Sequence, residues 1–120
     1  MTFNDNEQFL RRILPQWFNF VTREIQSWAF ANHPLTPDRM SVNWEKLSSV
    51  KQTAVDPSSG VASITAKVCY QENQDIEHTP QEDNPSHCDV VGLKNKTIQR
   101  RLRNAAVLRL APKNPANHKT

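Results

Sequence analysis

The sequence lacks most of the features that mark catalytic, membrane-spanning or disulfide-stabilised proteins. Its 120 residues include only two glycines and two cysteines. It contains no glycine-rich phosphate loop, no GxSxG and no HExxH motif. No apolar run approaches the roughly eighteen residues of a membrane-spanning helix, and the first residues are too polar and acidic for a signal peptide. We therefore expect a cytoplasmic protein that is not an enzyme.

Acidic side chains are missing from the C-terminal quarter of the chain. Residues 90–120 contain eight Lys or Arg and no Asp or Glu, whereas the first 89 residues carry seven basic and twelve acidic side chains. The net charge of +3 therefore combines a segment of −5 with a segment of +8. An asymmetry of this kind indicates a polyanionic partner.

Residues 92–110 hold most of this positive charge in a pattern that predicts a helix. At about 100° per residue, one arc of the helix is small and apolar and the opposite arc is cationic. The apolar arc consists of Ile98, Leu102 and Ala105. The cationic arc consists of Lys96, Arg100 and Arg103, and with Lys94 and Arg101 these are the candidate nucleic-acid-binding residues. Two other interpretations stay open: a solvated helix face, or neutralisation by the acidic segment 72–89.

The N-terminal segment is rich in aromatic residues at helical spacing. The pattern predicts a helix from about residue 5 to residue 31, kinked or restarted at Pro15. Its apolar positions occupy more than one face, so one small sheet cannot cover all of them. We therefore expect a homodimer with Trp17, Phe18 and Phe20 at its interface. In the competing account Pro15 bends the segment, and every aromatic side chain belongs to the core.

The middle of the chain predicts a small antiparallel sheet. Residues 36–47 favour a short helix, with a strand as second choice, and residues 50–55 and 61–71 favour a hairpin. Residues 72–89, with six acids and no base, are expected to form a long exposed loop. Residues 88–91 favour a short third strand, and the tail 112–120 is expected to be flexible.

Four residues invite a metal interpretation, namely Cys69, His78, His87 and Cys88. Zinc sites normally use pairs of ligands with short gaps between them, and no such pair is present. Cysteines next to strands are more often buried thiols. We therefore expect no metal and no cofactor.

From residue 36 onward the predicted order resembles the double-stranded-RNA-binding domain, which is α-β-β-β-α. In that family a glycine-containing turn with lysines opens the last helix, and alanines follow. Here Gly92-Leu93-Lys94-Asn95-Lys96 and Arg103-Asn104-Ala105-Ala106 match this order. The family's paired lysines fall on Gln99-Arg100 or on Asn95-Lys96, depending on the alignment. The family's Gly-Pro-x-His loop is replaced by Asp56-Pro57-Ser58-Ser59-Gly60, without a histidine.

The sequence thus predicts a single α+β domain with an N-terminal aromatic helix, an antiparallel sheet of about three strands and a C-terminal basic helix. Residues 1–34 would form the helical extension, 35–111 the α-β-β-β-α-like core and 112–120 the tail. The predicted function is non-catalytic binding of nucleic acid, double-stranded RNA above all, through the basic helix. The alternative is a protein–protein interaction or assembly module that uses the Trp-rich N-terminal helix.

Overall fold

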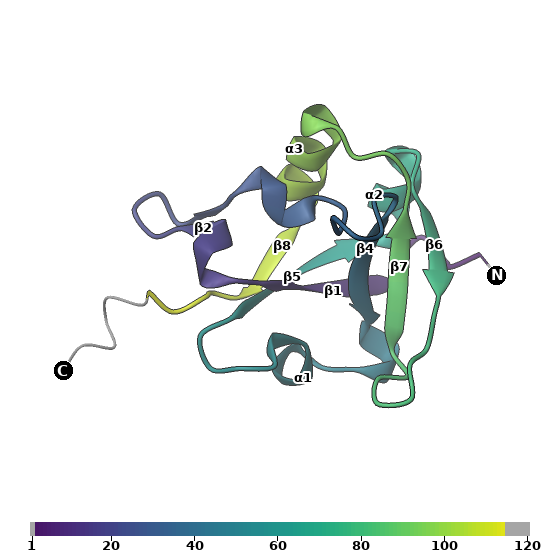
Figure 1. The fold of residues 1–120 in the computed structure, drawn as a ribbon, viewed down its shortest axis with the longest axis horizontal. Helices are drawn as coiled ribbons and strands as arrows, with labels where there is room; N and C mark the ends of the chain where they lie inside the picture. Colours follow the sequence, from purple (N-terminus) through teal and green to yellow (C-terminus); the bar gives the residue numbers. More distant parts are fainter. Residues whose placement is uncertain (1, 115–120) are drawn as a thin grey trace.

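One six-stranded antiparallel sheet, with strand order β6-β7-β4-β1-β5-β8, organises the fold (Figure 1). The computed structural model describes residues 2–114. The strands are β1 (Gln8–Ile13), β4 (Arg39–Trp44), β5 (Gly60–Thr65), β6 (Asp75–His78), β7 (His87–Val91) and β8 (Val107–Leu110). A separate two-stranded ladder joins β2 (Phe18–Asn19) to β3 (Glu24–Ile25). The helices are α1 (Val50–Ala54), α2 (Ala66–Gln71) and α3 (Lys96–Ala105), with 3-10 turns η1 (Pro15–Trp17), η2 (Ser27–Phe30) and η3 (Glu45–Leu47).

Strand β1 lies at the centre of the sheet and is covered on both faces. Every residue of β1 pairs with β5, from Gln8 opposite Thr65 to Ile13 opposite Gly60. Phe9 packs in the main core, whereas Leu10 belongs to a smaller cluster with Ala54 of α1. Both side chains are fully buried. A strand buried on both faces shows no alternation of apolar and polar residues.

The predicted N-terminal helix is therefore wrong. The apolar residues at 9, 10, 13 and 14 match a helical period, but a doubly buried strand gives the same pattern. After β1, Pro15 occupies the first position of η1. The chain continues through the short elements η1, β2, β3 and η2. These elements contribute four side chains to the core: Phe18, Ile25, Ala29 and Phe30. The core positions of Phe18 and Phe30 agree with the intramolecular account, whereas Trp28 is 52% exposed and does not.

The short helix predicted for residues 36–47 is also wrong, and the strand that was the alternative prediction is confirmed as β4. Strand β4 buries Met40 and Val42 on the core side while Ser41 stays exposed. This alternation has a period of two. The strand pairs with β7 along five positions and with β1 at two, Phe9 opposite Trp44 and Leu10 opposite Asn43.

The hairpin predicted for residues 50–71 holds only in its central part. Residues 60–65 form β5, but the stretch before them is α1, capped by the Ser49 hydroxyl, which accepts from Gln52 N at 3.1 Å. The stretch after them is α2, capped by Thr65, which accepts from Val68 N at 3.2 Å. Caps, rather than the β-branched composition, decide the structure on both sides of this strand.

The acidic segment 72–89 is a hairpin rather than a loop. Strands β6 and β7 pair from Asp75 opposite Val91 to His78 opposite Cys88. The short strand predicted for residues 88–91 is confirmed as part of β7. Buried Ile76 and Val90 supply its core side, and the acids lie mainly on the other side or at the turn.

The basic helix is confirmed as α3, but it ends earlier than predicted. Residues 107–110 instead form β8, which pairs with β5 at the edge of the sheet. Of the predicted flexible tail, Pro112 is buried and Lys113 N donates to Ser58 O at 2.9 Å. The rest of that tail, residues 115–120, lies outside the described residues.

The fold class is thus α+β, but it is not α-β-β-β-α. The chain begins with a strand, the main sheet has six strands rather than three, and α3 is the only helix longer than six residues in the part described. No helix within residues 2–114 is long and apolar enough to cross a membrane.

Replacing Gly60 by Ala should weaken the attachment of β8. A Cβ at Gly60 would lie 2.3 Å from Leu110 O and 2.6 Å from Pro112 Cδ. Overpacking of this kind costs about 1–3 kcal/mol, and we expect urea unfolding of Gly60→Ala to show such a loss. Hydrogen exchange should localise the change to the β5–β8 ladder and leave the β6–β7 ladder protected. Unchanged stability, or faster exchange spread evenly over the sheet, would contradict this prediction.

Candidate functional site

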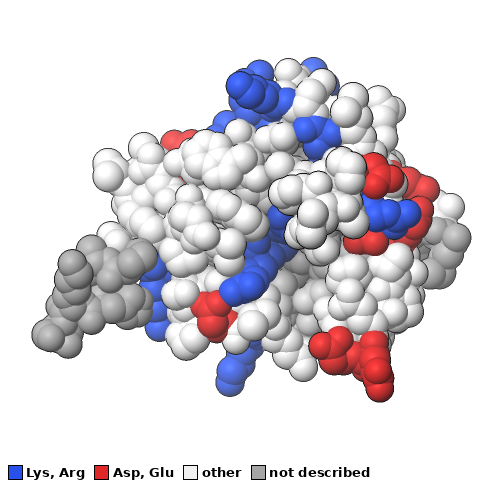
Figure 2. All heavy atoms as spheres, in the orientation of Figure 1, with Lys and Arg blue, Asp and Glu red and all other residues white. Residues whose placement is uncertain are grey.

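Helix α3 presents its cationic arc to solvent. The Asn95 side chain caps the helix by accepting from Ile98 N at 2.9 Å, and Gln99 Nε2 donates to Lys94 O at 2.8 Å. Leu102 is fully buried, Ile98 is half-buried, and the helix packs mainly on η2. This packing fixes which side faces outward, and Figure 2 shows basic atoms gathered over α3.

Most of the α3 cations have no acidic partner. Arg101 lies 3.4 Å from Glu72 Oε1, but its side chain is 63% exposed, and an exposed pair of this kind stabilises by about 0–1 kcal/mol. Lys96, Arg100 and Arg103 form no ion pair with any residue in 2–114. Arg103 is partly buried, and its Nε donates to Asn104 Oδ1 at 2.9 Å. Three guanidinium or ammonium groups therefore remain available to an external anion.

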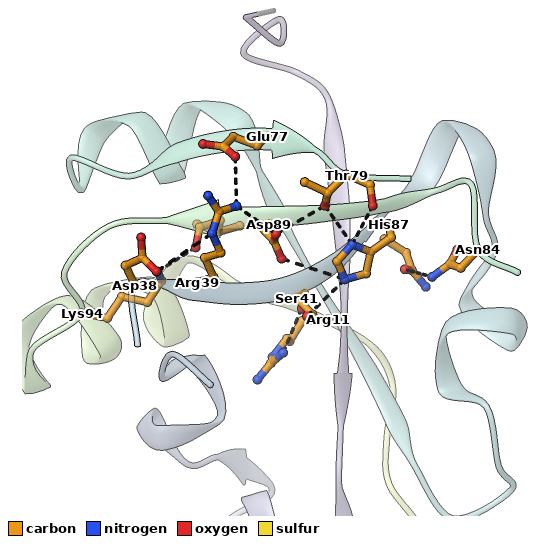
Figure 3. A network of polar contacts seen from close by, with 12 residues as sticks. Arg11, Asp38, Arg39, Ser41, Glu77, Thr79, Asn84, His87, Asp89 and Lys94 are labelled. Atoms are coloured by element: carbon orange, nitrogen blue, oxygen red, sulfur yellow. Dashed lines mark hydrogen bonds and ion pairs between the residues drawn. The ribbon is translucent and has the colours of Figure 1, made fainter. Parts of the chain in front are cut away.

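The acidic hairpin neutralises a different cation. Arg39 Nη1 donates to Glu77 Oε1 at 2.9 Å and to Asp89 Oδ2 at 3.1 Å (Figure 3). These hydrogen bonds, the one to Glu77 first, raise the pKa of Arg39 above its ordinary value. Of the acids in segment 72–89, Glu72 alone pairs with α3 among the described residues. Neutralisation of the basic helix by this segment is therefore slight.

Lys94 lies inside the protein rather than at its surface. The residue is 6% exposed, and its Nζ donates to Asn32 Oδ1 at 2.5 Å, Val90 O at 2.9 Å and Gly92 O at 3.1 Å. Desolvation by burial lowers the pKa of Lys94 to about 8. Lys94 holds the turn before α3 against Asn32. Its ammonium group is buried, so it is not available for the predicted contact with nucleic acid.

The three side chains predicted at a dimer interface belong to the core region. Phe18 is 5% exposed, and Trp17 and Phe20 are half-buried against the main core. Phe18 and Phe20 pack edge to face, with their ring centroids 5.1 Å apart. Of the three, Phe18 faces the core, and Trp17 and Phe20 keep part of their surface exposed.

His78 and Cys88 lie opposite each other in the β6–β7 ladder, but the cysteines and histidines of residues 2–114 form no metal-binding group. Cys69 and Cys88 are both buried and unpaired, and burial raises the pKa of each thiol to about 12. His78 Nε2 contacts Pro85 O at 2.8 Å, and His87 Nδ1 contacts Thr79 O at 3.1 Å. Within residues 2–114 no group of three or more His, Cys, Asp or Glu is placed to hold a metal ion.

A second polar site lies where β4 separates from β1, and the sequence analysis missed it. Arg11 Nη1 donates to Ser41 O at 2.8 Å, and its Nε donates to Ala29 O at 3.0 Å. Beside it opens a cleft of about 410 Å³. We call it the Arg11 cleft, and its polar lining consists of Arg11, Arg12, Ser41, Asn43, Thr53, Gln81, Asn84 and His87. The one signal in the sequence was the Arg11-Arg12 pair inside an apolar run.

The cleft is also bordered by a strained residue. Val55 has φ 71° and ψ −52°, and Asp56 N donates to Ala54 O at 2.8 Å, which defines a γ-turn of the rare kind with positive φ. The turn is held from the far side, because Asp56 accepts from Ser58 and Ser59 and pairs with Arg12. The Ser58 hydrogen bond above all, with those from Arg12 and Ser59, lowers the pKa of Asp56.

Comparison with known protein families, with curated proteins and with solved structures finds no match to this chain. The double-stranded-RNA-binding resemblance therefore rests on its quoted residues alone, and the α-β-β-β-α order that it implies is contradicted by the fold.

The stability of the protein should respond to the titration of Lys94. Its folded pKa of about 8 lies below the ordinary 10.5, so between these values the folded state binds fewer protons than the unfolded chain. Stability contributed by Lys94 must then rise as the pH rises through this window. We expect the urea midpoint of the wild type, relative to that of Lys94→Met, to increase between pH 8 and about 10.

The Lys94→Met variant serves as the control because it retains the buried thiols, whose raised pKa lowers stability as the pH increases above about 9. Parallel midpoint profiles for the two proteins would contradict the prediction.

Replacing Val55 by Gly should stabilise the protein. A non-glycine residue in this conformation costs about 1–3 kcal/mol, and the added entropy of Gly in the unfolded chain offsets about 0.5–1 kcal/mol of the gain. The Val55 side chain is 75% exposed, so little packing is lost. Urea unfolding should show Val55→Gly to be more stable than Val55→Ala, which keeps the Cβ. The reverse order would exclude strain at this turn.

Proposed function

We propose that this protein binds nucleic acid without catalysis, through Lys96, Arg100, Arg101 and Arg103 of α3. The observation that carries the proposal is a solvent-facing cationic arc of which three members have no carboxylate partner in residues 2–114. Such charges release condensed counterions when they neutralise phosphates, and this release drives sequence-independent binding.

The geometry of the arc suits the phosphate backbone better than base edges. Lys96 and Arg103 are seven positions apart, which is about 10 Å along a helix axis. That length spans a few phosphates and delivers few contacts, so binding should be weak, tolerant of sequence and sensitive to salt. Double-stranded RNA is the first ligand to test, because proteins recognise it through phosphates and 2′-hydroxyl groups.

The alternative function, a protein–protein interaction or assembly module, has lost the surface first assigned to it. The Trp-rich helix assigned to it is absent from the fold, and Phe18 is buried, while Trp17 and Phe20 are half-buried. We keep this alternative as the interpretation that a negative binding result would favour.

Removing the three charges of the arc that have no carboxylate partner in residues 2–114 tests the proposal. The variant Lys96→Ala/Arg100→Ala/Arg103→Ala should bind duplex RNA at least about tenfold more weakly at low salt, and the slope of log affinity against log salt should fall by about 0.7–0.9 for each lost phosphate contact. Lys96 and Arg100 face water and the Arg103–Asn104 hydrogen bond is exposed, so the melting temperature should change little. Gel shift or fluorescence anisotropy with duplex RNA, duplex DNA and single-stranded RNA at two salt concentrations measures this.

A variant of equal charge change provides the matched control. Lys46, Lys51 and Lys67 are exposed and lie outside α3, so replacing all three by Ala alters the net charge equally. Equal weakening by both triple variants would mean that net charge alone, rather than α3, attracts the nucleic acid. Absence of binding by the wild type at low salt with all three ligands would remove the proposed function.

A further inference from the structure

Arg11 is a cation that the described part of the chain leaves without a counterion. No carboxylate of residues 2–114 lies within 4.0 Å of it, and its hydrogen bonds go to two backbone carbonyls, Ala29 O and Ser41 O. Its guanidinium also lies 5.2 Å from the centre of the Trp17 ring. A guanidinium has five N–H donors, so these two hydrogen bonds leave donors unused beside the cleft.

The surroundings of Arg11 make this lack of a counterion costly. Desolvation by burial lowers the pKa of Arg11 to about 10, which still leaves it charged at neutral pH. Isolated charges in such places are normally paired. Asp56 is paired with Arg12, and Asp89 is paired with Arg39. An external anion would give Arg11 the counterion that it lacks.

The cleft also supplies hydroxyl and amide groups on the strands next to Arg11. Ser41 Oγ lies 3.2 Å from His87 Nε2, while His87 Nδ1 contacts Thr79 O, which can only accept (Figure 3). His87 Nδ1 also lies 2.9 Å from the Thr79 hydroxyl oxygen, so both ring nitrogens have polar partners on the neighbouring strands. On the other side Asn84 Nδ2 donates to Asn43 Oδ1 at 2.9 Å. These bonds hold the lining in place before any ligand arrives.

We propose that the Arg11 cleft is a phosphate-binding site that seats the phosphate of a nucleotide, free or at the end of a nucleic-acid strand. The planar fork of a guanidinium binds phosphate oxygens in pairs, and the volume of about 410 Å³ lies within the range of small-molecule sites. The strained turn at Val55 supports the assignment, because strained residues concentrate at functional sites. The site uses no residue of α3, so it goes beyond the nucleic-acid surface proposed above.

Val55 offers a test that leaves Arg11 and its structural hydrogen bonds intact. Its side chain is exposed at the border of the cleft, and Asp and Asn both tolerate positive φ. Val55→Asp adds a carboxylate to the lining of the cleft, where its charge repels a phosphate, whereas Val55→Asn has nearly the same shape without the charge. We expect Val55→Asp to weaken phosphate binding about tenfold or more and Val55→Asn to bind like the wild type.

The probes are inorganic phosphate, adenosine 5′-monophosphate, adenosine, and a short single-stranded RNA with either a 5′-phosphate or a 5′-hydroxyl. In amide-resolved NMR titrations, phosphate-bearing probes should shift the resonances of Arg11, Ser41 and Asn43, and adenosine should not. Binding of the mononucleotide identifies a free nucleotide as the source. Preference for the 5′-phosphorylated strand over both the mononucleotide and the 5′-hydroxyl strand identifies a strand end.

The α3 triple variant separates this proposal from the preceding one, because it should keep the response to phosphate and adenosine 5′-monophosphate. Arg11→Lys, which keeps the charge and loses the fork, should weaken the response if it folds. The proposal is overturned if no phosphate-bearing probe shifts these resonances at millimolar concentration, if the two Val55 variants respond alike, or if the α3 variant abolishes the response.

Discussion

The pairing of β1 with β5 on one side and β4 on the other is the constraint on which the rest of the structure depends. All six residues of β1 pair with β5, so the strand is fixed in register and both of its faces must be covered. The face that holds Phe9 is closed by η2, α2 and α3, and the face that holds Leu10 is closed by α1. The positions of all these helices follow from the burial of one strand on two sides.

The same constraint produces the Arg11 cleft. Strand β4 pairs with β7 along five positions but with β1 at only two, Asn43 and Trp44, so its backbone before Asn43 needs other partners on the β1 side. Arg11 supplies one by donating to Ser41 O. An arginine in the central strand thus completes the hydrogen bonding of a divided sheet, and the space left by the division is open to solvent. Arg11 thus both pairs with the β4 backbone and lines the cleft.

The distribution of charge in space differs from its distribution along the chain. The acids of β6 and β7 lie beside Arg39 on the sheet, whereas α3 projects away from it (Figures 1 and 3). Among the described residues of the basic segment, Arg101 pairs with Glu72 and Arg109 of β8 pairs with Glu45, whereas Lys96, Arg100 and Arg103 have no acidic partner. The separation of α3 from the acids of β6 and β7 leaves these three cations unneutralised, and it could not be inferred from net charge.

The sequence by itself determined the elements whose stability is local. The α3 helix follows from its opposed arcs, although Ala105 of the apolar arc is exposed, and β5 and β7 follow from short β-branched segments. It also determined that Lys96 and Arg100 face water, because Leu102 must face inward. Only the tertiary structure decided that residues 8–13 form a strand, since the apolar spacing fits a helix and a doubly buried strand equally well. Only the tertiary structure decided that Lys94 is buried and that Arg11 borders a cleft, because both depend on contacts with residues 18 to 62 positions away.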